Sequence, residues 1–216
     1  MPMLFVKHGA RADEEAAALD AARHPGVVEL VDVVDGALRT VRVDGRSLAD
    51  LPPLVPDEVA GVAAAVATTL ADLHERGVAH GGVEPSHVLV ATDGRILLCS
   101  LGRPAGPGDD VAALGRLVAD LLEASPPGRR APGRRRAPGR RRSARRDRRP
   151  ARLGSLLAPP AGPELAALAA RAADPDPSRR PSARQVAAFV HQRVPTARLP
   201  VVPPGGPAPA ARGGGD

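Results

Sequence analysis

Hydrophobic positions along the chain predict strands near the N-terminus and helices after them. Two Asp-Gly pairs, at 35–36 and 93–94, lie between β-branched apolar runs, and each pair is typical of a tight hairpin turn. Between the hairpins, a long amphipathic segment begins near Pro56 and ends at Gly77, as a helix does. Strands followed by helices indicate an α+β fold. The predicted elements are a strand at 3–7, a helix at 12–24, a hairpin at 26–45, a helix at 55–77, a hairpin at 87–102, a buried helix at 109–124 that is apolar nearly all round, a helix at 162–174 and a last helix from about Ser182.

Composition narrows the chemistry that the chain offers. It has two Phe and no Tyr or Trp among 216 residues, so few side chains are available to stack on bases or sugars. The single cysteine, Cys99, excludes an internal disulfide and predicts a reducing cytoplasmic location, and its apolar neighbours predict an inert core thiol. No signal-peptide pattern is present, and no apolar run reaches the roughly 18 residues of a membrane span.

The net charge of +6 comes from one segment. Residues 129–149 hold 12 Arg and one Asp, a local charge of +11, which leaves −5 for the rest of the chain. Pro, Gly and repelling charge predict a disordered insert at 125–152, and the Pro/Gly/Ala-rich tail at 195–216 is predicted to be disordered as well. Two interpretations of the Arg tract stay open: an arm that binds polyanions, or an expansion tolerated in a surface loop. Ser143, within the tract, offers a site for a basophilic kinase.

Four segments, in this order and spacing, resemble a protein kinase, in particular the bacterial Ser/Thr protein kinases. They are EAAALDAARHPGVVELVDV, LADLHERGVAHGGVEPSHVLVATDGRILLCSLG, DVAALGRLVADLL and AADPDPSRRPSARQV. The resemblance implies a bilobal fold, with a small, truncated β-rich lobe at 1–46 and a mainly helical lobe at 47–194. Only six residues precede Lys7, too few for the two strands and glycine-rich loop that the family places there, and an upstream start codon is one explanation.

The residues that the family uses for catalysis are replaced. Its catalytic loop, His-Arg-Asp followed after four residues by Asn, reads His80, Gly81, Gly82 and then His87. Glycine cannot act as the carboxylate base, and imidazole is a poor ligand for Mg²⁺, which prefers oxygen. The metal-binding Asp of the family's Asp-Phe-Gly becomes Ser100. These substitutions, which no nearby residue makes good, predict a pseudokinase with no catalytic residues and no metal site.

The phosphate-contacting lysine of the family is matched by Lys7, and its partner on the regulatory helix by Glu15. Two interpretations stay open for this pair: a structural ion pair, or two solvated charges. If nucleotide binds, these two residues are the candidates to hold it. Phe5 falls where the family keeps a small roof residue of the adenine pocket, so we expect its ring either to fill that pocket or to face the sheet core.

The remaining matches imply scaffold roles. Asp110 matches the aspartate that braces the catalytic-loop backbone, and Gly102 ends the metal loop. His80 is expected to be a buried structural histidine that packs against Leu101. Arg180 matches an arginine that pairs with a glutamate of the activation segment, but only six residues separate Gly102 from Asp109, so we expect Arg180 to have lost its usual partner. Leu19 is expected to continue the stack of His80 and Leu101, and Leu89 to line the base of the cleft.

Three functions follow as hypotheses. The first is a non-catalytic kinase-like module that docks or regulates protein partners in a signalling pathway. The second is a divergent, weakly active Ser/Thr kinase that transfers phosphate from ATP. The third is polyanion binding through residues 129–149, which salt should weaken. No cofactor is expected, although ATP without Mg²⁺ stays open.

Overall fold

The computed structural model describes residues 3–126 and 161–203, and within them it has two small antiparallel sheets and five α-helices. Sheet A consists of β1 (Leu4–His8), β2 (Leu30–Val34) and β3 (Ala37–Val41), in the order β1-β3-β2. Sheet B consists of β4 (Gly45–Ser47), β5 (Val88–Ala91) and β6 (Ile96–Leu98), in that order. The α-helices are α1 (Ala12–Ala22), α2 (Pro56–Glu75), α3 (Pro107–Ala124), α4 (Ala161–Ala172) and α5 (Ala183–Arg193), and the short 3₁₀ turns are Leu48–Asp50, Pro85–His87 and Pro177–Arg179. The predicted α+β class is confirmed.

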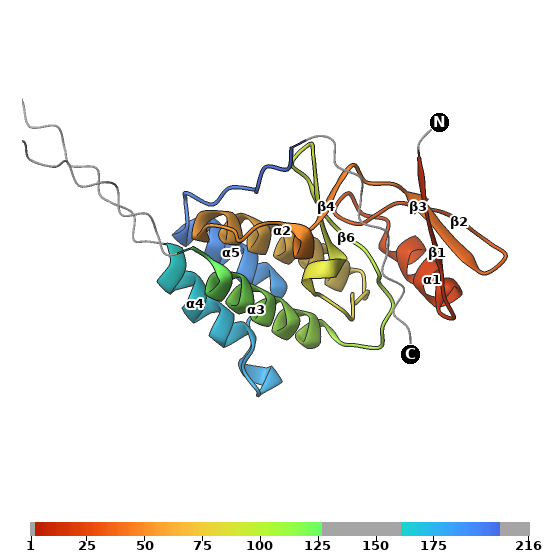
Figure 1. The fold of residues 1–216 in the computed structure, drawn as a ribbon. Coiled ribbons are helices and arrows are strands. Elements are labelled where there is room, and N and C mark those ends of the chain that lie inside the picture. The colour runs from red at the N-terminus through yellow and green to blue at the C-terminus, as the bar shows by residue number, and fades with distance from the viewer. Residues whose placement is uncertain (1–2, 127–160, 204–216) are drawn as a thin grey trace, which may run out of the picture.

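Sheet A and α1 lie at one end of the molecule, α2 to α5 at the other, and sheet B between them (Figure 1). Both predicted hairpins are present. The first turns at Asp35 and Gly36, whose φ angles of +52° and +70° suit the right-handed twist of the flanking strands. The second turns through Gly94, with φ +86°. The sequence therefore placed the turns correctly because Asp-Gly pairs favour these angles.

Helix α2 lies in the core of the helical end. Its Pro56 is the first helical residue, Glu58 accepts a hydrogen bond from the backbone N–H of Val55, and Gly77 follows its end with φ +74°. Twelve of its residues are buried, and it packs against both α3 and α5. A helix buried on more than one face needs small side chains, and Ala supplies most of them here. None of the described helices is long and apolar enough to cross a membrane.

Helix α3 differs from the prediction of an apolar surface nearly all round. Its inner face is buried, but Arg116, Asp120 and Glu123 lie exposed on the outer face. The many Ala and Leu between these charges obscured the helical period. Gly115 brings α3 close to α4, since a Cβ there would lie 2.8 Å from the carbonyl oxygen of Ala169.

The C-terminal segment also differs from its prediction. Residues 195–203 have no regular secondary structure, yet they lie on the N-terminal part of α2. The N–H of Arg198 donates to the carbonyl of Asp57 at 3.0 Å, and Val202 is only 3% exposed. Gly61 permits this contact, because a Cβ there would lie 2.0 Å from the carbonyl oxygen of Arg198. The prediction that the chain is disordered from residue 195 onward is therefore wrong for residues 195–203, which pack on α2. Residues 204–216 of the predicted tail and the Arg tract at 129–149 lie outside the described residues.

Candidate functional site

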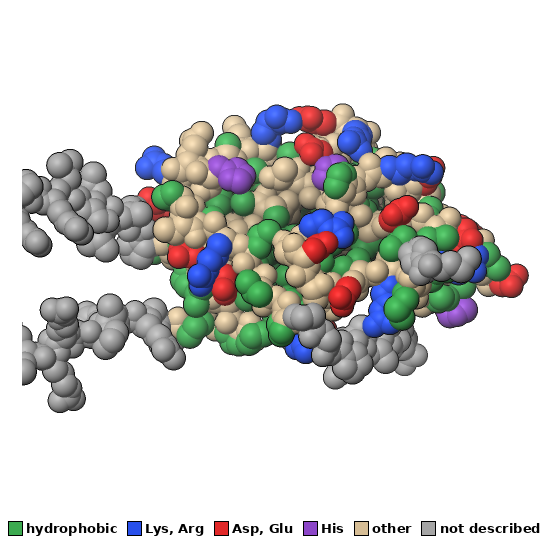
Figure 2. All heavy atoms as spheres, turned by 90° about the horizontal axis from the view of Figure 1, so that it is seen from above, with side chains coloured by type: hydrophobic (Ala, Val, Ile, Leu, Met, Phe, Trp, Pro, Cys, Tyr) green, Lys and Arg blue, Asp and Glu red, His purple; other side chains and the backbone are tan. Residues whose placement is uncertain are grey.

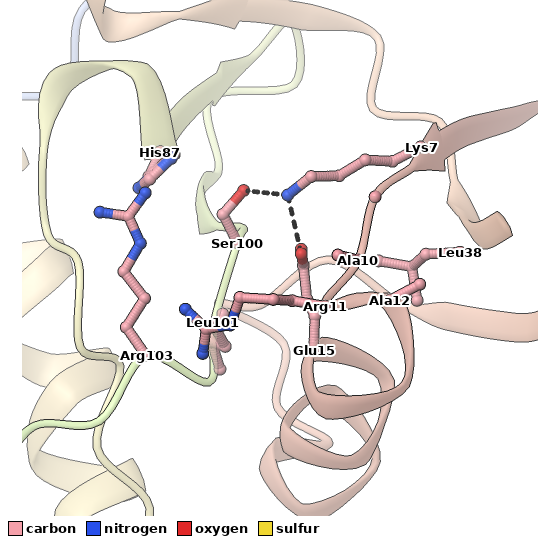
Figure 3. A pocket seen from close by; sticks show the side chains of 11 residues that line it. Lys7, Ala10, Arg11, Ala12, Glu15, Leu38, His87, Ser100, Leu101 and Arg103 are labelled. Atoms are coloured by element: carbon pink, nitrogen blue, oxygen red, sulfur yellow. Dashed lines mark hydrogen bonds and ion pairs between the residues drawn. The ribbon is translucent and has the colours of Figure 1, made fainter. Parts of the chain in front are cut away.

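The candidate site is a pocket of about 220 Å³ between the β1–α1 connection and the loop that follows β6 (Figure 3). It brings together Lys7, Glu15, His87, Ser100 and Leu101, which the sequence had placed in one cleft. The residues that line it are Lys7, Gly9, Ala10, Arg11, Ala12, Glu15, Leu38, His87, Ser100, Leu101 and Arg103.

Lys7 lies at the centre of the polar contacts in this pocket. Its Nζ donates to Oε2 of Glu15 at 2.7 Å and to Oγ of Ser100 at 3.2 Å (Figure 3). The Glu15 side chain is 11% exposed and that of Lys7 40%. Lys7 and Glu15 therefore form an ion pair rather than two separately solvated charges. Because the lysine is accessible to water, solvent screens much of its attraction.

The loop that contains Ser100 has an unusual backbone. Ser100 has φ +62° and Gly102 has φ +91°, while Leu101 between them is buried at 3% exposure. A non-glycine residue in the left-handed region costs about 1–3 kcal/mol, so the surrounding packing must hold this conformation. Burial raises the pKa of the neighbouring Cys99 thiol to about 11, which supports the predicted inert cysteine.

The Asp110 carboxylate accepts hydrogen bonds from the backbone of the loop at 80–82. Its Oδ2 accepts from the N–H of His80 at 2.8 Å, and its Oδ1 from the N–H of Gly81 at 2.8 Å. Nε2 of His74 lies 2.9 Å from the same Oδ2. With its side chain 1% exposed, Asp110 is a fully buried carboxylate that is satisfied by three partners. Both carboxylate oxygens of Asp110 thus bond to the backbone of this loop, and its role as the brace of the loop stays a prediction.

His80 is fully buried. Its Nδ1 accepts from the N–H of Gly82 at 3.1 Å, and no described residue offers a hydrogen-bond partner to its Nε2. Burial lowers the pKa of His80 to about 4, against the opposing effect of the Asp110 carboxylate. The imidazole is therefore neutral at physiological pH. These properties agree with a structural histidine.

Gly82 and His87 occupy the positions where a base and a metal ligand were expected. His87 donates from Nδ1 to the carbonyl of Gly82 at 2.7 Å, and its Nε2 lies 3.1 Å from a Glu84 carboxylate oxygen. Both ring nitrogens are thus engaged with the protein. Among the described residues, no cluster of three or more His, Cys, Asp or Glu side chains is placed to hold a metal ion.

One expectation from the sequence is corrected. Phe5 neither fills the pocket nor packs in the sheet core, because the residue is 42% exposed and does not line the pocket. Its strand is at the edge of sheet A, where few neighbours cover it. Arg180, which we expected to have lost its usual glutamate partner, donates to the carbonyls of Asp174 at 2.8 Å and Gly108 at 3.0 Å. Its Nη1 also lies 3.6 Å from a carboxylate oxygen of Asp109, so this arginine ties the start of α3 to the turn before α5.

Sequence reasoning missed the two arginines that line the pocket, Arg11 and Arg103. Arg11 precedes α1 and donates to a Glu14 carboxylate oxygen at 2.7 Å and to the carbonyl of Gly102. Arg103 directly follows Gly102, and its side chain extends toward His87 (Figure 3). The available signal was adjacency: each arginine lies within four residues of a residue already placed in the cleft.

No protein-family model matches this chain, and a search of curated proteins found no similar sequence.

Proposed function

We propose that the chain is a non-catalytic, protein-kinase-like module that docks or regulates protein partners. In this proposal sheet A and α1 correspond to the small lobe, and α2 to α5 to the helical lobe. The resemblance of the sequence motifs supports the correspondence. So does the meeting of Lys7, Glu15 and the loop at 100–102 in one pocket.

One contact carries the proposal: the donation of Lys7 Nζ to the Ser100 hydroxyl at 3.2 Å. Phosphoryl transfer depends on positioning and on metal ions that neutralise the phosphate charge. A carboxylate at residue 100 would both pair with Lys7 and hold Mg²⁺, whereas a hydroxyl accepts the lysine and offers no charge to a cation. Gly82 supplies no proton acceptor either. The lysine and its partner are thus kept, and the groups for the chemistry are replaced.

The test is phosphotransfer from radiolabelled ATP by the purified full chain, with Mg²⁺ and with Mn²⁺. We expect no incorporation above that of a Lys7→Ala control, on the chain itself or on a general protein substrate. Incorporation that Lys7→Ala abolishes would instead establish a weakly active kinase. A thermal-shift titration with ATP gives a second result, because a bound ligand raises the melting temperature by mass action. Stabilisation that requires the metal would contradict the proposal.

A further inference from the structure

We propose that the pocket around Lys7 binds a small phosphate-bearing anion without a metal ion, with Arg11 and Arg103 supplying the positive charge. The inference rests on the proposed function for the choice of this pocket as the site, but metal-free binding of an anion does not require that phosphoryl transfer be absent. The inference adds a ligand class, and it assigns the recognition to two arginines.

The charge of the pocket favours an anion. Its lining has three cations, Lys7, Arg11 and Arg103, against one carboxylate, Glu15, which gives a formal charge of +2 with His87 neutral. By contrast, the chain outside 129–149 has a net charge of −5. Figure 2 shows acidic and basic side chains interspersed on the face seen from above, rather than separated by sign. A positive pocket on an acidic body concentrates anions locally.

The two arginines have donors to spare. Arg11 uses Nε on Glu14 and Nη2 on the Gly102 carbonyl, and these contacts fix its orientation. Within residues 3–126 and 161–203, the Arg103 guanidinium makes no hydrogen bond or ion pair. The side chains enter the pocket from different walls, Arg11 from the start of α1 and Arg103 from the loop after β6 (Figure 3). A guanidinium presents parallel N–H groups that match phosphate oxygens.

Two glycines give Arg103 its place. A Cβ at Gly82 would lie 3.3 Å from Cδ of Arg103 and 3.6 Å from its Nε, so a larger side chain there would crowd the guanidinium. Gly81 has φ +78°, and a Cβ on it would lie 2.1 Å from the Arg103 carbonyl oxygen. An aspartate at 82, as in an active kinase, would also pair with Arg103 and draw it away from a ligand. The absence of a carboxylate at residue 82 is therefore coupled to an Arg103 guanidinium that has no polar partner within residues 3–126 and 161–203.

The size of the pocket limits the ligand. Sites for drug-sized molecules measure about 300–1,000 Å³, and this pocket is about 220 Å³. Its lining residues include no Phe, Tyr or Trp on which a base would stack. The fit is thus to one or two phosphate groups, such as pyrophosphate or the head of a phosphate ester, rather than to a whole nucleotide.

The experiment is calorimetric titration of the full chain with inorganic pyrophosphate in EDTA, with Arg103→Ala and Arg171→Ala as the pair of variants. Arg171 is exposed near the end of α4, so its removal costs the same charge at the other end of the molecule. We expect Arg103→Ala to weaken binding by about tenfold to a hundredfold, because a charge-assisted hydrogen bond to the ligand is lost, and Arg171→Ala to leave it unchanged. Anion binding by the Arg tract is common to all three proteins and cancels in the comparison.

Equal affinity in the wild type and Arg103→Ala, or binding seen only when Mg²⁺ is added, would overturn the inference. Phosphotransfer activity, in contrast, would contradict the proposed function and leave metal-free binding intact. If Arg103→Ala unfolds, Arg103→Lys keeps the charge without the planar fork, and we expect it to bind pyrophosphate more weakly than the wild type. Inorganic phosphate and ATP, titrated in the same buffer, separate a one-phosphate from a two-phosphate site and show whether a nucleoside adds affinity; the size argument predicts that it does not.

Discussion

Two carboxylates in this protein, Asp110 and Glu15, are bound in very different ways. Asp110 is 1% exposed and accepts from two loop N–H groups while contacting His74, so every partner is fixed by the backbone or by packing. Glu15 has one strong partner, Lys7, whose own side chain is 40% exposed. The first arrangement holds the shape of the loop at 80–82. The Lys7–Glu15 ion pair joins β1 to α1 at the solvent-accessible side of the pocket.

The difference indicates which interactions the fold needs. Removing one member of a buried polar network leaves the others unsatisfied in a low-dielectric interior. An exposed ion pair is replaced by water at small cost. If the loop is scaffold and the pocket is a ligand site, substitutions in the first should change stability, and substitutions in the second should change binding.

Replacing Asp110 should have the largest effect. Asp110→Asn keeps the shape but replaces one acceptor oxygen by an NH₂ donor, which then faces the N–H of either His80 or Gly81. We therefore expect a loss of about 3 kcal/mol in the free energy of unfolding. Urea denaturation measures it. Asp120→Asn, exposed on the same helix, is the control and should change stability by less than about 0.5 kcal/mol. Equal effects of the two variants would show that Asp110 is no brace.

Two adjacent glycines allow a sharper comparison within the loop. Gly81→Ala places a Cβ 2.1 Å from a backbone oxygen at φ +78°, and we expect it to cost about 2 kcal/mol or more in the free energy of unfolding. Gly82→Ala meets the flexible Arg103 side chain at 3.3 Å and Nδ1 of His87 at an ordinary contact distance of 3.6 Å, and it should cost less than about 1 kcal/mol.

Thermal and urea unfolding of both glycine variants, side by side, test this. If Gly82→Ala were the more damaging, the left-handed conformation of Gly81 would be wrong. Gly82→Ala should also weaken pyrophosphate binding, because it displaces the guanidinium of Arg103, whereas its effect on stability stays small. A variant that changes binding without changing stability is the result expected of a pocket residue.

Much of the fold was predictable from the sequence because its signals are local. The Asp-Gly turns, Pro56 at the start of α2 and Ser182 before α5 each act within a few residues, and each prediction is confirmed. Residues 195–203 were not predictable in this way. Their position depends on Gly61, more than 130 residues earlier, whose missing side chain admits the Arg198 carbonyl. Composition alone described this segment as a tail.

The pocket shows the same division. Lys7, Glu15 and Ser100 were placed together by matching motifs, and the structure brings them within hydrogen-bonding distance. Arg11 and Arg103 match no motif, so only the three-dimensional structure shows that they share the pocket. Phe5 was misplaced because the motif fixed its position in the strand but not how much of the sheet would cover it.

The Lys7–Glu15 pair should contribute least to stability. A double-mutant cycle with Lys7→Met and Glu15→Gln isolates the coupling, which we expect to be below about 1 kcal/mol and to fall with added salt, since the lysine is 40% exposed. Urea unfolding of the four proteins gives the value. A coupling above about 2 kcal/mol, insensitive to salt, would place this pair with Asp110 among the braces of the fold and remove the contrast between the two regions. A small coupling, together with weaker pyrophosphate binding in Lys7→Met, would show that the lysine is kept for its ligand rather than for the fold.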